Sequence, residues 1–207
     1  LQKWLKESGF RCRYAYTNEK GPFNEARAKN IGIRQASGDY VISTNADIIF
    51  EENFLLALDA AFDVFPGALM LCRRYDFEKD LVDYYGERGV EKLEELRTRN
   101  STVLRSQSWV GDCQASSKKN FEEIRGFYEA VLGWGRLDND LRNRMEDAGK
   151  KVFWLNPFTF IAHQNHEQDL EKTKREEERN QRVMDKKYAD FRRNLDADWG
   201  QIRGKGT

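Results

Sequence analysis

Short apolar runs alternate with amphipathic stretches along most of the chain, which is the order expected of an α/β domain. The clearest run is Tyr40–Thr44, which follows a glycine, is rich in β-branched residues and ends on Asn45 and Asp47. This pattern is typical of a buried parallel strand whose carboxyl end opens into a crevice, where α/β sheets bind ligands. It predicts a polar site on a rigid element. Taken alone, Asp47 more often caps the next helix or satisfies a turn.

The same patterns predict the remaining elements. Apolar periodicity and end signals predict helices over residues 1–9, 24–37, 51–65, 118–124 and 137–148. Alternating or continuous apolar runs predict strands over residues 10–17, 68–72, 109–116, 152–155 and 158–162.

Two stretches depart from this alternation. Residues 75–108 are polar with a helical pattern, which favours an insertion on the rim of the sheet. Residues 167–193 are dense in charge and predict a solvated helix held by a few apolar side chains. We therefore expect one α/β domain over residues 1–166, followed by a charged helical tail over residues 167–207.

Composition excludes several classes of protein. The 207 residues include 35 Lys and Arg and 35 Asp and Glu, so the net charge is zero. The chain therefore lacks the surplus of basic residues that would indicate binding to nucleic acid or to a membrane surface. The three cysteines, Cys12, Cys72 and Cys113, show neither metal spacing nor a disulfide framework, which favours a reducing, cytoplasmic location. The sequence shows no signal peptide and no apolar run of transmembrane length.

Three motifs in the first half resemble a known family. They are Phe23–Gly32, Gly38-Asp39-Tyr40 and Asn45-Ala46-Asp47, and they resemble the nucleotide-sugar half of GT-A glycosyltransferases of the family 2 type. The resemblance implies a GT-A (Rossmann-like) fold, in which a mixed sheet is flanked by helices.

The second half carries a further resemblance. Ser117–Phe127, followed by Gly133-Trp134-Gly135 and an acidic cluster, is similar to β-1,4-galactosyltransferases and polypeptide N-acetylgalactosaminyltransferases. The similarity runs from about Phe23 to His166, in the same order and spacing. It implies a nucleotide-sugar donor and a carbohydrate acceptor as partners.

The resemblance also implies a divalent cation, Mn²⁺ or Mg²⁺. Asp47 matches the second acid of the family's Asp-x-Asp motif, which holds the metal, and Asn45 stands where the first acid usually is. His163 and His166, the two histidines of the chain, both fall where the family supplies its last metal ligand. One of them is sufficient. Carboxylate, imidazole and diphosphate oxygens together suit Mn²⁺ at least as well as Mg²⁺.

Further donor-binding residues are implied near the start of the resemblance. Phe23 sits where galactosyltransferases place a ring against uracil, and Asn24 and Arg27 follow it in the same motif. Glu25 stands where a basic residue is expected. For Arg27 the alternative is an ordinary solvated helix face.

The donor sugar is expected to lie against three residues of the second half. Trp134 forms the floor beneath it, Gly135 lets the backbone approach, and Gly111 lies beside it. The alternative is a tight turn carrying a core indole.

Asp138 aligns with the acid that deprotonates the acceptor hydroxyl in inverting members of the family, which is chemistry for a positioned carboxylate. Asn139 and Asp140 are expected beside the acceptor, although Asp140 alternatively caps the following helix. Leu137 and Asn139 replace acids that bind the acceptor sugar in galactosyltransferases, which indicates a different acceptor.

The function expected is metal-dependent transfer of a sugar from a nucleotide diphosphate donor, such as a UDP-sugar, to a carbohydrate hydroxyl with inversion. A catalytically inactive module that binds glycans or nucleotides is the alternative. A nucleotidyltransferase is a third possibility, but the glycine- and lysine/arginine-rich loop that it needs near its amino terminus does not occur.

In the family, two strands and a helix precede the segment with which this chain opens. The resemblance therefore predicts an incomplete sheet, completed by residues outside this sequence or by a second copy in a dimer.

Overall fold

The computed structural model describes residues 12–17, 21–77, 111–164, 167, 169–185 and 191–202. The helices are α2 (Glu25–Gln35), α3 (Phe54–Val64), α6 (Lys118–Glu123), α7 (Leu137–Asp147) and α8 (Leu170–Met184). The strands are β1 (Tyr40–Thr44), β2 (Ile48–Phe50), β3 (Leu69–Leu71), β4 (Arg74–Phe77), β5 (Cys113–Ser117), β6 (Val152–Trp154) and β7 (Ile161–Gln164).

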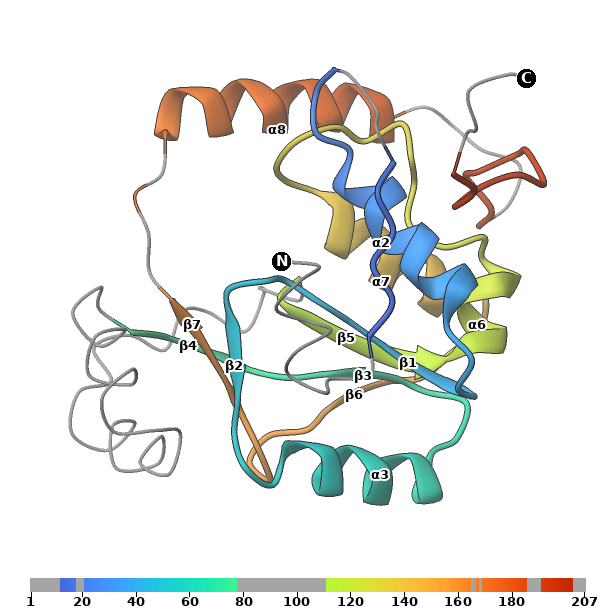
Figure 1. The fold of residues 1–207 in the computed structure, drawn as a ribbon, viewed down its shortest axis with the longest axis vertical. Helices are drawn as coiled ribbons and strands as arrows, with labels where there is room; N and C mark the ends of the chain where they lie inside the picture. Colours follow the sequence, from blue (N-terminus) through green and yellow to red (C-terminus); the bar gives the residue numbers. More distant parts are fainter. Residues whose placement is uncertain are drawn as a thin grey trace.

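The strands form two small mixed sheets. The first has the order β1-β5-β3-β6, with β5 antiparallel to both neighbours and β3 parallel to β6. The second has the order β2-β7-β4, with an antiparallel and a parallel pair. Helix α3 lies on one side of the strands, and α2, α6 and α7 lie on the other, with α8 outermost (Figure 1).

Strand β3 separates two hydrophobic cores, because successive side chains of a strand point to opposite faces. Leu69 and Leu71 pack with α2, α6 and α7, whereas Met70 packs with α3. All three side chains are at most 1% exposed. The continuous apolar run in the sequence is therefore a strand buried on both faces, as predicted.

Strand β1 differs from its prediction in direction and position. In the described part of the chain its one partner is β5, which is antiparallel to it, and β1 lies at the edge of its sheet. Only alternate residues of β1 are buried, Val41 and Ser43. A strand with one buried face and one that faces outward carries the same β-branched residues as a central strand, so composition did not distinguish them.

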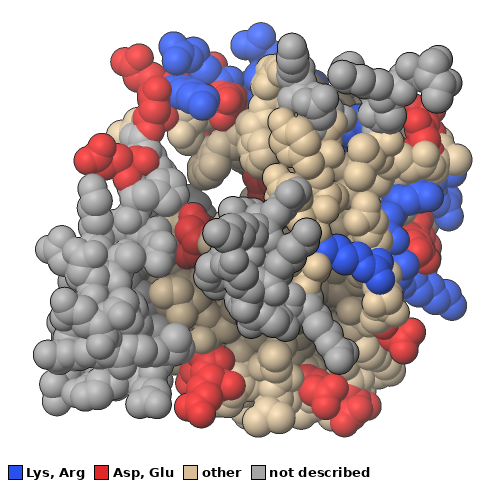
Figure 2. Space-filling view, viewed as in Figure 1, with Lys and Arg blue, Asp and Glu red and all other residues tan. Residues whose placement is uncertain are grey.

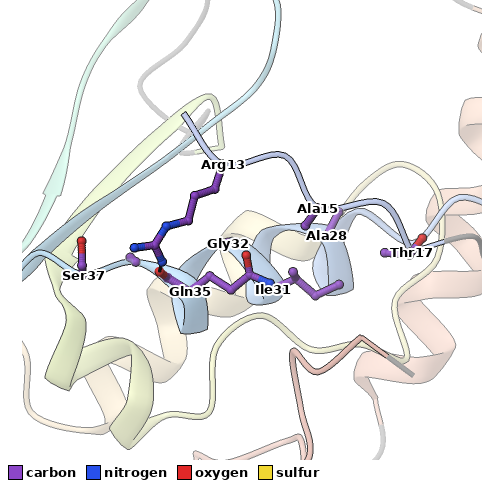
Figure 3. Close-up of a pocket in the computed structure, with 9 residues that line it drawn as sticks. Arg13, Ala15, Thr17, Ala28, Ile31, Gly32, Gln35 and Ser37 are labelled. Carbon is purple, nitrogen blue, oxygen red and sulfur yellow. Dashed lines mark hydrogen bonds between the residues drawn. The ribbon is translucent and has the colours of Figure 1, made fainter. Parts of the chain in front are cut away.

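The strand predicted over residues 10–17 is wrong for the part that the structure describes. Residues 12–17 form no strand and run along α2, where the Arg13 guanidinium donates to the Gln35 carbonyl at 2.9 Å. A cavity of about 350 Å³ separates this segment from the helix (Figure 3). Tyr14 and Tyr16 are exposed. Aromatic residues alternate with arginine in this segment, which is the sequence pattern of a strand. The pattern carries no information on whether a neighbouring strand is present.

Several boundaries also moved. Helix α3 begins at Phe54 and has no acid in its first turn. The rim insertion that was expected from Tyr75 onward begins with strand β4. The rest of that insertion, residues 78–110, lies outside the described residues. Helix α8 ends at Met184, and residues 191–202 pack back on the body through Phe191 and Trp199. None of the described helices is long and apolar enough to cross a membrane.

Two buried asparagines hold the irregular segment after α6. Asn30 of α2 donates to the Phe127 carbonyl at 2.8 Å and accepts from the Phe127 amide at 2.7 Å. Asn194 donates to the carbonyls of Arg125 and Phe127 and accepts from the Glu129 amide. Since a buried backbone group without a partner is costly, these side chains replace the ladder that a regular element would supply.

Asn30→Ala should therefore destabilise the fold by about 1–3 kcal/mol, because it leaves the buried amide of Phe127 without its acceptor, whereas the Phe127 carbonyl keeps its hydrogen bond from Asn194. Thermal and urea unfolding measure the change. Asn143→Ala, on the exposed face of α7, is the matched control and should change stability by less than about 0.5 kcal/mol. Equal stability of the two variants would contradict the role given to Asn30.

Candidate active site

A cavity of about 660 Å³ lies where the β1–β2 turn, the start of β5, the start of α7 and helix α8 meet. Helix α8 carries neighbouring acidic and basic side chains, and the surface is hollowed beneath it (Figure 2). The lining includes eight residues predicted from the sequence: Asn45, Asp47, Gly111, Trp134, Gly135, Asp138, Asn139 and His163. They come from segments up to 118 positions apart, from Asn45 to His163, so the fold assembles them.

Asp47 and His163 meet through strand pairing. Asp47 directly precedes β2, and Ile48 lies opposite His163 in the β2–β7 ladder. The Asp47 Oδ2 and His163 Nε2 atoms are 3.2 Å apart. Two donors at right angles around an ion, each about 2.1 Å from it, are about 3 Å apart, so the pair fits one divalent cation.

The described residues contain no cluster of three His, Cys, Asp or Glu side chains that could hold a metal ion. His166 lies outside the described residues. A cation bound by one carboxylate and one imidazole needs further oxygen ligands, such as those of a diphosphate or water.

Asp112 is a site residue that the sequence analysis missed. Its buried carboxylate accepts from Arg74 at 2.8 Å and from the Asn45 side-chain amide at 3.3 Å. A negative charge thus lies beside Asn45, where the resemblance had expected an acid. The available signal was an aspartate inside an otherwise apolar and small-residue strand segment.

The Gly133-Trp134-Gly135 turn is held open by helix α8. Gly133 and Gly135 have φ of 64° and 93°, which favour glycine, and a Cβ on Gly133 would lie 2.5 Å from the Glu176 carboxyl group. Glu176 also accepts from the Trp134 amide at 2.9 Å. The Trp134 side chain is 38% exposed, so the alternative of a core indole is wrong.

Asn180, four residues after Glu176 on α8, also binds the backbone of the Gly-Trp-Gly segment. Its side chain is fully buried and donates to the carbonyls of Leu132, Trp134 and Gly135 at 3.1, 2.9 and 3.2 Å. This fixes the backbone that presents Trp134 to the cavity.

Asp138 stands in the first turn of α7, where the helix dipole favours a negative charge. Gln114 donates to its main-chain carbonyl at 3.1 Å, and Lys29 lies 3.4 Å from its carboxylate. A Cβ on Gly111 would lie 2.3 Å from Oδ2, so glycine provides the space for the carboxylate. Burial raises the pKa of Asp138 to about 6, with Lys29 opposing the increase and Glu25 and Asp112 adding to it.

Four predicted site residues lie away from the lining. Phe23 is 70% exposed, and its carbonyl accepts from the Gly133 amide. Asn24 caps α2 and donates to the Glu129 carbonyl. Arg27 is buried and donates to the Gln201 carbonyl, so the solvated helix face considered for it is wrong. Asp140 is the fourth.

The carboxylate of Asp140 is buried in α7 and pairs with Arg144 and Arg193, both at 2.7 Å. Burial lowers the pKa of Arg144, and the Asp140 carboxylate opposes that change. These contacts join α7 to the segment after α8, which is a structural role.

The sequence profile of glycosyl transferase family 2 matches residues 1–125, which is more than half of the chain. The chain belongs to glycosyl transferase family 2. A second profile, described as the N-terminal domain of galactosyltransferase, matches residues 97–167 of this family 2 domain.

Two curated relatives of the family 2 domain are galactosyltransferases. β-1,4-Galactosyltransferase 5 of Danio rerio is 27% identical over 153 residues, covering 73% of this chain and 33% of that protein. β-1,4-Galactosyltransferase 4 of Cricetulus griseus is 38% identical over 71 residues, covering 31% of this chain and 21% of that protein. The chain thus spans a third or less of the length of these relatives.

The solved structure of GalNAc-T7 confirms the fold. GalNAc-T7 with UDP, GalNAc and Mn²⁺ superposes with a TM-score of 0.52 at 16% identity, covering 72% of this chain and 32% of that one. The catalytic domain of Drosophila β-1,4-galactosyltransferase 7 with xylobiose gives a TM-score of 0.42 at 18% identity, covering 75% and 56%. By its superposition on GalNAc-T7, the family 2 domain has the mixed α/β GT-A fold predicted from its motifs.

The raised pKa of Asp138 predicts a stability difference that depends on pH. Its folded pKa lies above the usual value near 4, so wild type loses stability as pH rises from about 4 through 6. Asp138→Asn removes this loss and should exceed wild type by roughly 1–2 kcal/mol at pH 8, allowing for the partial exposure of the carboxylate. Urea unfolding at pH 4, 6 and 8 measures the difference. A difference that stays constant over this range would contradict the burial of an ionised Asp138.

Proposed function

We propose that this chain is a metal-dependent glycosyltransferase domain that transfers a sugar from a nucleoside diphosphate donor, a UDP-sugar, to a carbohydrate hydroxyl. One observation carries the proposal: the Asp47–His163 pair, the exposed Trp134 and the Asp138 carboxylate all line a single cavity. GalNAc-T7, whose structure contains UDP and Mn²⁺, supports the choice of donor class and metal.

Each residue has a defined task in this proposal. Asp47 and His163 hold the divalent cation, Mn²⁺ or Mg²⁺, and His166 is the alternative histidine ligand. When bound, such a cation stabilises the charge of the departing diphosphate. The exposed face of Trp134 supports the donor sugar, and Gly135 allows the backbone to approach it.

Asp138 accepts the proton of the acceptor hydroxyl. A pKa of about 6 leaves the carboxylate mostly ionised at neutral pH while keeping it basic enough to accept a proton. A base acting on the acceptor opposite the leaving group produces inversion. Asn139, in the same helical turn and also in the lining, would contact the acceptor.

The second candidate is a binding module without transfer activity. Asn45 favours it, because an amide replaces the first acid of the metal motif. Asp112, hydrogen-bonded to that amide, weighs against it by keeping a carboxylate at the same place. The cytoplasmic location and the dimer remain predictions.

Asp47→Ala should abolish the part of UDP affinity that depends on Mn²⁺, because it removes the charged ligand of the cation. Isothermal titration of UDP with and without Mn²⁺ measures this part. His163→Ala should weaken it by roughly tenfold or more. Asp59→Ala, exposed on α3, is the control. Unchanged UDP affinity in Asp47→Ala would remove the metal assignment.

Asp138→Asn should lower turnover by about a hundredfold or more while UDP affinity persists, because a nearly isosteric amide cannot accept the proton. Initial rates with a panel of UDP-sugars and saccharide acceptors provide the test. Wild-type turnover in the variant would contradict Asp138 as the base. Donor binding without turnover in wild type would favour the binding module.

A further inference from the structure

Three charged side chains form a short chain at the wall of the cavity, where Glu25 and Asp138 belong to the lining and Lys29 lies between them. Glu25 and Lys29 are one turn apart on α2, with the Lys29 ammonium 2.7 Å from the Glu25 carboxylate and 3.4 Å from that of Asp138. Pairs of this spacing usually lie on an exposed helix face. Here the Lys29 side chain is only 10% exposed, and its ammonium also lies 5.1 Å from the centre of the Phe127 ring.

We propose that Lys29 is a positioning residue that holds the Asp138 carboxylate ionised and turned into the cavity, and that Glu25 moderates this effect. The inference rests on the proposed function, in which Asp138 is the base. It assigns the pH range of the reaction to two residues of helix α2.

The geometry gives Lys29 little freedom for any other task. Its ammonium is held between two carboxylates and over an aromatic ring, whereas Glu25 is the member of the pair that reaches the cavity lining. Burial lowers the pKa of Lys29, but Asp138 and Glu25 outweigh that effect and the net shift is upward. The ammonium therefore keeps its charge throughout the range in which Asp138 titrates.

Other charges surround Asp138 on several sides. Asp112 lies before β5 and raises the pKa of Asp138, as Glu25 does. Arg136 of α7 and Lys172, Glu176 and Glu177 of α8 line the same cavity, and Arg136 pairs with Glu177 at 3.1 Å. Lys29 is the cation whose ammonium contacts the Asp138 carboxylate in the described part of the chain.

Two substitutions in one ion pair should therefore move Asp138 in opposite directions. Lys29→Met keeps the packing on Phe127 but removes the positive charge, and should raise the Asp138 pKa by about one unit or more. Glu25→Gln removes a negative charge and frees Lys29 to act on Asp138 alone, so the pKa should fall by roughly half a unit or more. Lys29→Arg keeps the charge and should stay near wild type.

The direct measurement is a ¹³C NMR titration of the aspartate carboxyl groups in the metal-free 207-residue chain, with the Asp138 signal assigned from Asp138→Asn. The acid limb of the kcat/KM profile against pH, measured with Mn²⁺, should move in the same directions. Lys119→Met, exposed on α6, is the control and should move neither.

A merely structural Lys29 would lower stability in Lys29→Met without displacing the Asp138 titration, and that result would overturn the proposal. A role in binding the diphosphate is a different outcome: UDP affinity would fall sharply in Lys29→Met while the titration stayed in place, which also overturns it. Because the titration needs no turnover, its result is independent of whether the chain transfers sugar. Loss of activity in every assay would contradict the proposed function alone.

Discussion

The site depends on backbone hydrogen bonds made by three buried asparagine side chains. The segment from the end of α6 to the start of α7 contains the Gly-Trp-Gly turn but no regular element, so its amides and carbonyls have no ladder to join. Asn30 and Asn194 satisfy its first part, and Asn180 satisfies the turn itself. An amide can donate and accept at once, which is why one residue type performs all three tasks. Together with Glu176, which accepts from the Trp134 amide, these asparagines fix the backbone that carries Trp134.

The second constraint is electrostatic. Asp138 is placed where burial opposes its charge, beside a lysine that supports it and two carboxylates that oppose it. Such an arrangement lowers stability at neutral pH in exchange for a carboxylate with basic character. Asp140, two residues further along the same helix, faces the interior and is neutralised by two arginines. Neighbouring positions on one helix thus separate a carboxylate that lines the cavity from one that is paired in the interior.

Much of this arrangement could be predicted from the sequence, because strands buried on both faces and capped helices leave strong local patterns. Leu69–Leu71 and the helix after Asn24 are examples. The same is true of the cavity lining, since the motif order placed Asp47, Trp134, Asp138 and His163 in one site. Local pattern could not predict which strands pair. The direction of β1 depends on a partner some seventy positions away, and residues 12–17 have the sequence pattern of a strand but form none.

The tertiary contacts of Asn24, Arg27 and Asp140 could not be predicted for a related reason. The sequence does not distinguish a polar side chain that contacts a ligand from one that hydrogen-bonds to the backbone of another segment. Lys29 shows the converse, because nothing in its immediate neighbours marks it as a contact of Asp138. Only the tertiary contacts reveal which polar groups meet.

The attachment of α8 to the Gly-Trp-Gly turn has a consequence for how the protein is made. Glu176 and Asn180 follow the turn by more than forty residues, so during synthesis the turn leaves the ribosome well before the side chains that satisfy its amides and carbonyls. Both sheets can pair from residues that precede α8. The strands of both described sheets are therefore synthesised before the two side chains that complete the wall carrying Trp134.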